Sequence, residues 1–218
     1  MSRRSVTLSE IESTIKKVAQ AKGLSWGLAE EAGKSARWLS AYDYPGAEIA
    51  FEYLSSIDSE GYALAAPDAT GKIWKPRDQW QCPIASGAAL SDRVLQLISG
   101  GEIMIQQIKY PLLVCGILGQ AARVYVKSMQ LCWEHCEFVC HAEGITVSGG
   151  TEQLIPPHPV DLLCRCTAPS EPEVLPHCHA SKIETSVWQQ IDQIAALTYA
   201  PATEQSRAGA GAGLTDND

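Results

Sequence analysis

Apolar residues recur at helical spacing through the first part of the chain. In residues 7–22, apolar side chains fall three or four positions apart, which places them on one face of a helix. The same spacing predicts a second helix over residues 26–41. Pro45 suits the first turn of a third helix, which we expect to run to Ser56. Residues 1–58 are therefore predicted to form a three-helix unit with short turns.

The pattern changes in residues 59–90, where glycine and proline interrupt short apolar runs. We expect an irregular, loop-rich segment here, with one short strand near residues 71–75. A short helix is expected over residues 91–98, because Ser91 is a good cap and Gly100-Gly101 ends the pattern. This segment therefore separates the helical unit from the rest of the chain.

The second half of the chain is rich in residues that favour strands. Strands are predicted at residues 102–108, 124–133, 137–142, 145–148 and 160–167. Residues 110–123 predict a helix between the first two strands, and residues 181–197 predict a closing helix. The predicted fold class is α+β, with a helical unit, a small mainly antiparallel sheet, a closing helix and a Gly/Ala-rich tail. The two parts, 1–58 and 59–218, are expected to form one compact domain.

Composition narrows the range of functions. The chain has 218 residues, 45% of them hydrophobic, which is enough for a sizeable core. Its formal net charge is -8 and no Lys/Arg cluster stands out, so we expect neither nucleic acid nor an anionic membrane as partner. No run reaches the ~18 apolar residues of a membrane helix, and Arg3-Arg4 is not followed by the apolar run of a secretion signal. A cytoplasmic protein is expected.

Eight cysteines raise the question of a metal site. Thiolates and imidazoles bind zinc, and Cys164, Cys166 and His179 are the candidate ligands. The segment with Cys132, Cys136 and Cys140 predicts strands, and no knuckle-like spacing stands out. Packing of reduced thiols in the core is the favoured interpretation, and zinc binding is a lesser alternative.

The segment His141-Ala-Glu143 invites comparison with the H-x-E motif of zinc deaminases. That motif needs a helix start and a later P-C-x-x-C, and both are missing here. On a strand the two side chains share one face, so an acid/base pair is one hypothesis. A strand end at a solvated turn is the simpler interpretation.

The last twenty residues carry the most unusual local chemistry. Their glycines do not form G-x-G-x-x-G, because Leu214 fills the last position and no strand precedes them. Small residues nevertheless let backbone N–H groups approach an anion, arginine grips carboxylates or phosphates, and aspartates bind hard cations. The predicted ligand-binding residues are Arg207, Gly209, Gly211, Gly213, Asp216 and Asp218, and Ser206 is a candidate nucleophile. Composition alone also fits a disordered end.

Three segments carry a family resemblance: Gly23-Leu-Ser-Trp-Gly-Leu-Ala-Glu-Glu-Ala, Pro111-Leu-Leu113, and the ending from Ser206-Arg to Gly-Leu-Thr-Asp-Asn-Asp218. The chain resembles, over nearly its whole length, a bacterial family of unknown function, the domain of unknown function 3726. The resemblance implies no reaction. It does imply that the tail belongs to the domain and is ordered.

The second predicted helix also resembles the N-terminal helices of malate/L-lactate-type dehydrogenases of the non-Rossmann kind. The Asp-x-x-Gly-x-x-Ser-His-Gly stretch of that family is missing after Tyr42-Asp43. That activity is therefore not carried over to this chain.

Two functional hypotheses follow. In the first, the chain is a small-molecule metabolic protein, such as an enzyme, whose tail closes a pocket lined by Trp26, Glu30, Glu31 and Arg37. Arg207 and the tail amides then bind an anionic group, while Glu30 or Glu31 acts as a base. In the second, the chain is a non-catalytic accessory subunit that docks through its tail, or a homo-oligomer that exchanges it. The sequence specifies neither a cofactor nor a reaction.

Overall fold

A computed structural model describes residues 2–57, 65–176 and 178–198. Three helices follow the opening strand: α1 (Leu8–Ala21), α2 (Trp26–Ala41) and α3 (Gly46–Ser55). They confirm the predicted helical segments. Residue Thr7 caps α1, because its hydroxyl accepts the Glu10 N–H at 3.2 Å. The helices α1 and α2 pack closely at Gly33, where an added Cβ would lie 2.5 Å from the Glu12 carbonyl oxygen.

The main sheet has six strands in the order β2-β3-β7-β4-β5-β6. Its bounds are β2 (Ile73–Trp74), β3 (Glu102–Ile108), β7 (Val160–Thr167), β4 (Ser128–Trp133), β5 (Cys136–Cys140) and β6 (Ile145–Ser148). Only β2 and β3 run parallel, and the other pairs are antiparallel, so the predicted α+β class with a mainly antiparallel sheet is confirmed.

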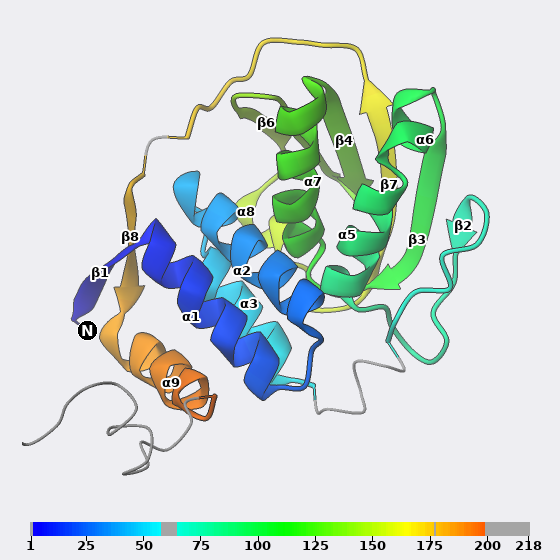
Figure 1. Cartoon of the computed structure of the whole chain (residues 1–218). Helices are drawn as coiled ribbons and strands as arrows, with labels where there is room; N and C mark the ends of the chain where they lie inside the picture. Colours follow the sequence, from blue (N-terminus) through cyan, green and yellow to red (C-terminus); the bar gives the residue numbers. More distant parts are fainter. Residues whose placement is uncertain (1, 58–64, 177, 199–218) are drawn as a thin grey trace, which may run out of the picture.

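Helix α7 (Pro111–Tyr125) lies in front of the sheet in Figure 1 and contacts β4 and β5. Helix α2 packs on α7, and the Ser35 hydroxyl donates to the Leu113 carbonyl at 2.8 Å. Five of the eight cysteines are buried, as the interpretation as core residues predicted: Cys82, Cys115, Cys136, Cys140 and Cys164. One continuous hydrophobic core thus includes residues from the N-terminal helices and from the sheet.

Two sequence predictions fail in the middle of the chain. The segment expected to be irregular contains α5 (Pro83–Asp92), which is followed at once by α6 (Val94–Ile98). The thiol of Cys82 caps α5 by accepting the Ala85 N–H at 3.3 Å, a role that sequence rules reserve for hydroxyl and carboxylate side chains. The predicted strand over residues 124–133 starts only at β4, because α7 runs on to Tyr125 and Val126 ends it with a φ of 51°.

The start and the end of the described chain form a second, two-stranded sheet. Strand β1 (Arg3–Thr7) pairs antiparallel with β8 (Ala180–Glu184), and α9 (Thr185–Ala196) follows β8 (Figure 1). The predicted closing helix was therefore placed too early, since its first residues are a strand. The short α8 (Thr151–Leu154) was also not predicted. In the part of the chain that the structure describes, no helix combines the length and the apolar character needed to cross a bilayer.

Candidate functional site

The first candidate base, Glu30, is tied into the contact between α1 and α2. Its Oε1 accepts from Lys16 Nζ at 2.8 Å and from Trp26 Nε1 at 3.1 Å. The Lys16 ammonium also lies 4.2 Å from the Trp26 ring centroid. The hydrogen bond and charge of Lys16 hold the pKa of Glu30 below its ordinary value. A general base works best with a pKa near the working pH. The contact with Lys16 moves the pKa of Glu30 further below neutral pH, so it makes Glu30 a poorer general base.

The other residues of the predicted pocket lie on two faces of α2. Arg37 Nη1 pairs with Glu12 Oε2 of α1 at 2.7 Å, so it faces the same helix as Glu30. Glu31 instead pairs with Lys34 at 2.9 Å and lines an open hollow of about 300 Å³ beside α5 and α7. Residues Trp26 and Glu30 are thus brought together, whereas Glu31 is directed elsewhere.

The candidate metal ligands lie in different parts of the structure. Cys164 and Cys166 share one face of β7 in the six-stranded sheet, and Cys164 is fully buried. His179 is exposed beside β8, where its carbonyl accepts the Leu8 N–H at 3.2 Å. Within residues 2–57, 65–176 and 178–198, no group of three or more His, Cys, Asp or Glu side chains is arranged to hold a metal ion.

The buried His141, just after β5, lies within hydrogen-bond distance of side chains of β4 and β6. Its Nδ1 lies 3.0 Å from the Ser128 hydroxyl and its Nε2 lies 3.1 Å from the Thr146 hydroxyl. Burial lowers the pKa of His141, which favours the neutral ring at neutral pH. Glu143 is exposed at the following turn. The two side chains therefore do not share one environment.

The predicted tail residues lie outside the described part of the chain. They are Ser206, Arg207, Gly209, Gly211, Gly213, Asp216 and Asp218. Their roles as nucleophile, anion-binding residues and cation ligands stay predictions.

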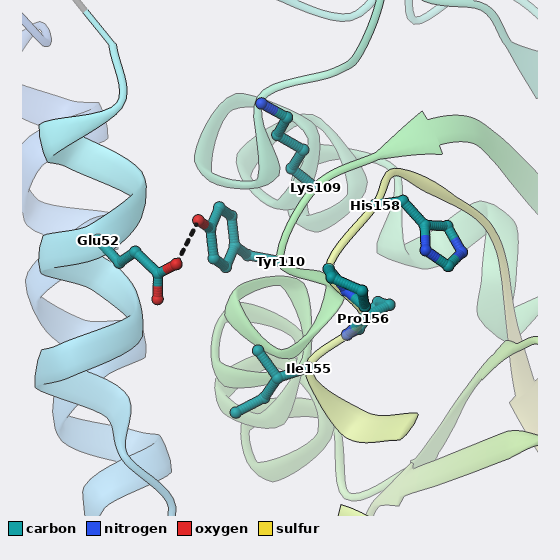
Figure 2. A pocket seen from close by; sticks show the side chains of 7 residues that line it. Glu52, Lys109, Tyr110, Ile155, Pro156 and His158 are labelled. Carbon is teal, nitrogen blue, oxygen red and sulfur yellow. Dashed lines mark hydrogen bonds between the residues drawn. The ribbon is translucent and has the colours of Figure 1, made fainter. Parts of the chain in front are cut away.

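A different set of residues surrounds a cavity of about 310 Å³ (Figure 2). Three separate segments form its wall: α3, the turn between β3 and α7, and the loop between α8 and β7. The lining residues are Glu52, Lys109, Tyr110, Ile155, Pro156, Pro157 and His158. In Figure 2, Glu52 points from its helix toward Tyr110, while Lys109 and His158 lie on other sides of the tyrosine. Apolar and charged groups therefore meet around one small space.

Tyr110 connects two walls of the cavity. Its hydroxyl donates to Glu52 Oε1 at 3.1 Å (Figure 2). Burial and the Glu52 carboxylate raise the pKa of Tyr110 to about 12. The hydroxyl therefore stays protonated at neutral pH and remains a hydrogen-bond donor. The ring also stands edge-on to Tyr53, with 5.9 Å between the ring centroids, which holds it in place.

The two basic side chains of the cavity have different partners. Lys109 Nζ lies 4.3 Å from the centroid of the Trp80 ring, a cation–π contact that leaves its charge without a carboxylate. His158 Nε2 lies 2.8 Å from Glu134 Oε1. The Lys109 ammonium is thus the charge best placed to meet a ligand.

Backbone strain is concentrated around this cavity. Five non-glycine residues in the described part have a positive φ, a conformation that costs about 1–2 kcal/mol for most residues. Tyr110 lines the cavity (φ 51°), Gln107 (φ 53°) lies near the end of β3 just before this turn, and Glu134 (φ 47°) contacts His158 of the cavity wall. Strain of this kind often marks ligand-binding positions, so it supports the cavity as the candidate site.

The strained turn has a visible cause. The pairing of β3 with β7 shifts register between Ile105 and Ile108, and Gln107 N–H donates to Asp161 Oδ1 at 2.9 Å in the irregular part. Tyr110 then begins α7 without a side-chain cap, and Pro111 is its first residue. The N-terminal end of a 15-residue helix carries partial positive charge. The bulge and this helix start place Lys109 and Tyr110 in the cavity wall.

The sequence alone did not identify Glu52, Lys109, Tyr110 or His158 as site residues. The motif Tyr110-Pro111 was interpreted only as a helix start, and the proline-rich loop at His158 only as a loop. The one usable signal was a histidine among prolines, because an ordered proline-rich loop presents a side chain at low entropic cost. No periodicity connects residues that come from three distant segments.

The chain shows distant likenesses to solved structures. It is similar to a crystal structure of malate dehydrogenase from Entamoeba histolytica, with a TM-score of 0.43 and 8% identity over 78% of this chain. It is also similar to a crystal structure of delta1-piperideine-2-carboxylate reductase from Pseudomonas syringae pvar.tomato, with a TM-score of 0.37 and 12% identity over 61% of this chain. The matches cover 51% and 43% of those two chains, so this chain spans about half of their length. At these values neither activity carries over.

Sequence comparison gives a narrower result. No curated protein matches the chain. Residues 6–71 match the family model described as "Protein of unknown function (DUF3726)", and this match confirms the family resemblance over that part of the chain.

Proposed function

We propose that this protein binds a small molecule through an anionic group in the cavity formed by Glu52, Lys109, Tyr110 and His158. The observation that carries the proposal is the position of Lys109. Lys109 lines a cavity of about 310 Å³, and no described carboxylate pairs with its ammonium. Cavities of this size suit small ligands, and a few charged groups on an otherwise apolar wall give orientation.

The surrounding residues have complementary roles. Lys109 attracts the anionic group, and the N-terminal end of α7 adds to the positive potential there. Trp80 holds the lysine side chain by its ring. Ile155 and Pro156 supply an apolar wall for the rest of the ligand. The proposal is thus a binding function for a metabolite-sized molecule, and it keeps the anionic ligand class that the sequence predicts.

Thermal unfolding with a panel of small carboxylates and phosphates tests this function. A ligand at 100 times its Kd stabilises a protein by about 2.7 kcal/mol, which corresponds to roughly 5–10 °C for a chain of this size. We expect at least one compound to raise Tm by this amount. Lys109→Met should abolish the shift, because it removes the ammonium and keeps most of the stem.

The matched control is Lys182→Met. Lys182 is exposed in β8, so this substitution removes one positive charge from the two-stranded sheet, away from the cavity. If both variants lose the ligand response equally, net charge explains binding and the cavity does not. If no carboxylate or phosphate stabilises the native protein, the proposed function is wrong.

The same thermal-unfolding assay tests a separate proposal about Arg207 in the C-terminal tail. Arg207 is expected to contribute a second contact to the anionic group, because a guanidinium binds carboxylates through two parallel hydrogen bonds. Arg207→Ala should then weaken the response that Lys109→Met abolishes. An unchanged response in Arg207→Ala would remove the tail from the binding site and leave the cavity proposal intact.

A further inference from the structure

We infer that the ligand of the cavity is a zwitterion of the amino-acid type, with its carboxylate at Lys109 and its ammonium at Glu52. This inference rests on the proposed function and names the ligand class for the same site. It arises because the cavity presents one unpaired positive group and one unpaired negative group on different walls.

The charges in this cavity differ from those on the face between α1 and α2. Neighbouring charges on α1 and α2 pair directly at 2.7–2.9 Å, as in Lys16–Glu30 and Arg37–Glu12. Glu52 and Lys109 line one cavity, yet no ion pair joins them, and the described residues offer neither of them another salt-bridge partner. Two opposite charges held apart across a small space are complementary to a ligand that carries both.

The hydrogen bond from Tyr110 fixes the negative wall. Its hydroxyl donates to Glu52 Oε1, and among the described side chains it is the only hydrogen-bond donor to this carboxylate. The interaction orients Glu52 without neutralising it, because a phenol brings no charge. Figure 2 shows the carboxylate turned toward the tyrosine ring, from the wall formed by α3. An ammonium group is the natural partner for the remaining acceptor positions of Glu52.

The positive wall has no such neutral partner. Lys109 lies above Tyr110 in Figure 2, beside the start of α7, and its one described contact is the Trp80 ring. His158 is already paired with Glu134, so any positive charge on this ring is balanced. The free charges of the cavity therefore reduce to Lys109 and Glu52.

Other ligand classes fit this arrangement less well. A dicarboxylate would bring a second negative group toward Glu52, and like charges in contact repel each other. A simple amine would leave Lys109 unpaired. An amino acid places its two groups on the two charges and its side chain against Ile155 and Pro156.

Calorimetric titration of the full chain with matched ligands tests the inference. The first series is the common L-amino acids, and the second contains, for each amino acid, the deamino acid that lacks the ammonium. We expect one amino acid to bind at least 10-fold more tightly than its deamino analogue. Glu52→Gln should remove this preference, whereas Lys109→Met should weaken the binding of both compounds.

The outcomes separate the inference from the function it rests on. Equal affinities within each matched pair, or tighter binding of the deamino acid, would overturn the inference of a zwitterionic ligand. The proposed anion-binding function would still stand. Failure of every carboxylate in both series would overturn the zwitterion, and failure of the phosphates as well would overturn the anion site. Glu171→Gln, on the exposed loop after β7, is the charge-matched control and should bind like the native protein. The native ligand series decides the inference even if Glu52→Gln does not fold.

Discussion

Two charged regions of this molecule use similar side chains in different ways. On the face between α1 and α2, lysine, arginine and glutamate come from regular helices and pair with one another. Around the cavity, Lys109 and Tyr110 come from a strained turn, and Glu52 and Lys109 stay apart. The first arrangement uses charge to hold two helices together. The second leaves charge available for a ligand.

The difference shows what distinguishes a site from a solvated surface. Charged residues at helical spacing readily find partners on the neighbouring helix, as Arg37 does with Glu12. Around the cavity, the backbone conformation itself restricts where the side chains point. Tyr110 at φ 51° and the bulge before it fix the direction of both Lys109 and the hydroxyl that reaches Glu52. At Tyr110, a strained backbone thus coincides with a hydrogen bond to Glu52, whose carboxylate forms no ion pair in the described structure.

The largest expected effect tests the packing role of the α1–α2 face. Gly33→Leu should lower the free energy of unfolding by about 3 kcal/mol, because its Cβ would lie 2.5 Å from the Glu12 carbonyl oxygen. Chemical denaturation measures this change. Gly27→Ala is the control: nothing lies within 4 Å of its added Cβ, so it should be neutral or stabilising. A mild effect of Gly33→Leu would mean that the helices pack less closely than described.

The second prediction contrasts one cation from each region. Lys109→Met should weaken ligand binding at least 10-fold, about 1.4 kcal/mol, whereas Arg37→Met should leave the affinity unchanged, because Arg37 is occupied by Glu12. Calorimetric titration with the best compound of the panel gives both numbers. If Arg37→Met loses ligand affinity and Lys109→Met does not, the ligand binds at the face of α2 and not in the cavity.

The third prediction concerns strain outside the cavity. Val126→Gly should raise the free energy of unfolding by about 1 kcal/mol, because a β-branched residue at φ 51° ends α7 where glycine is the favoured residue. Its side chain is 72% exposed, so little packing is lost. Denaturation and ligand titration together check the result. Weaker ligand binding by this variant would show that the strained backbone at Val126 also contributes to the binding site.

The smallest effect is a pH dependence on the α1–α2 face. Lys16 holds the pKa of Glu30 below its ordinary value of 4.5. A lowered pKa contributes stability that is present above the unfolded pKa and is lost as pH falls through the folded pKa. Lys16→Met should therefore return the pKa of Glu30 toward 4.5, as followed by NMR titration of the carboxyl carbon. As the pH falls through the folded-state pKa of Glu30, the native protein should lose the small excess in free energy of unfolding that it has over the variant. An unchanged pKa would show that Lys16 does not hold Glu30.

The sequence predicted local elements better than distant contacts. Periodicity located α1 to α3, and alternation located β6 and β7, because each signal is contained within its own segment. Strand β1 was missed because its partner β8 lies at the other end of the described chain. Helix α5 was missed because a thiol is an unusual cap.

The candidate site was less predictable for the same reason. Glu52, Tyr110 and His158 come from three segments, and each looks ordinary within its own segment. The left-handed conformations of Gln107 and Tyr110 follow from the register shift between β3 and β7, which no local pattern announces. The sequence did suggest an anionic ligand from the tail, but those residues lie outside the described structure.

The central claim is that the cavity, and not the face between α1 and α2, binds the ligand. Amide and side-chain NMR spectra of isotope-labelled full-length protein, recorded during titration with the best compound of the panel, test it most directly. The account predicts saturable shifts at Glu52, Lys109, Tyr110, Ile155 and His158, with residues such as Glu30 and Arg37 unmoved. Shifts centred on Glu30 and Arg37, with the cavity residues unmoved, would contradict it.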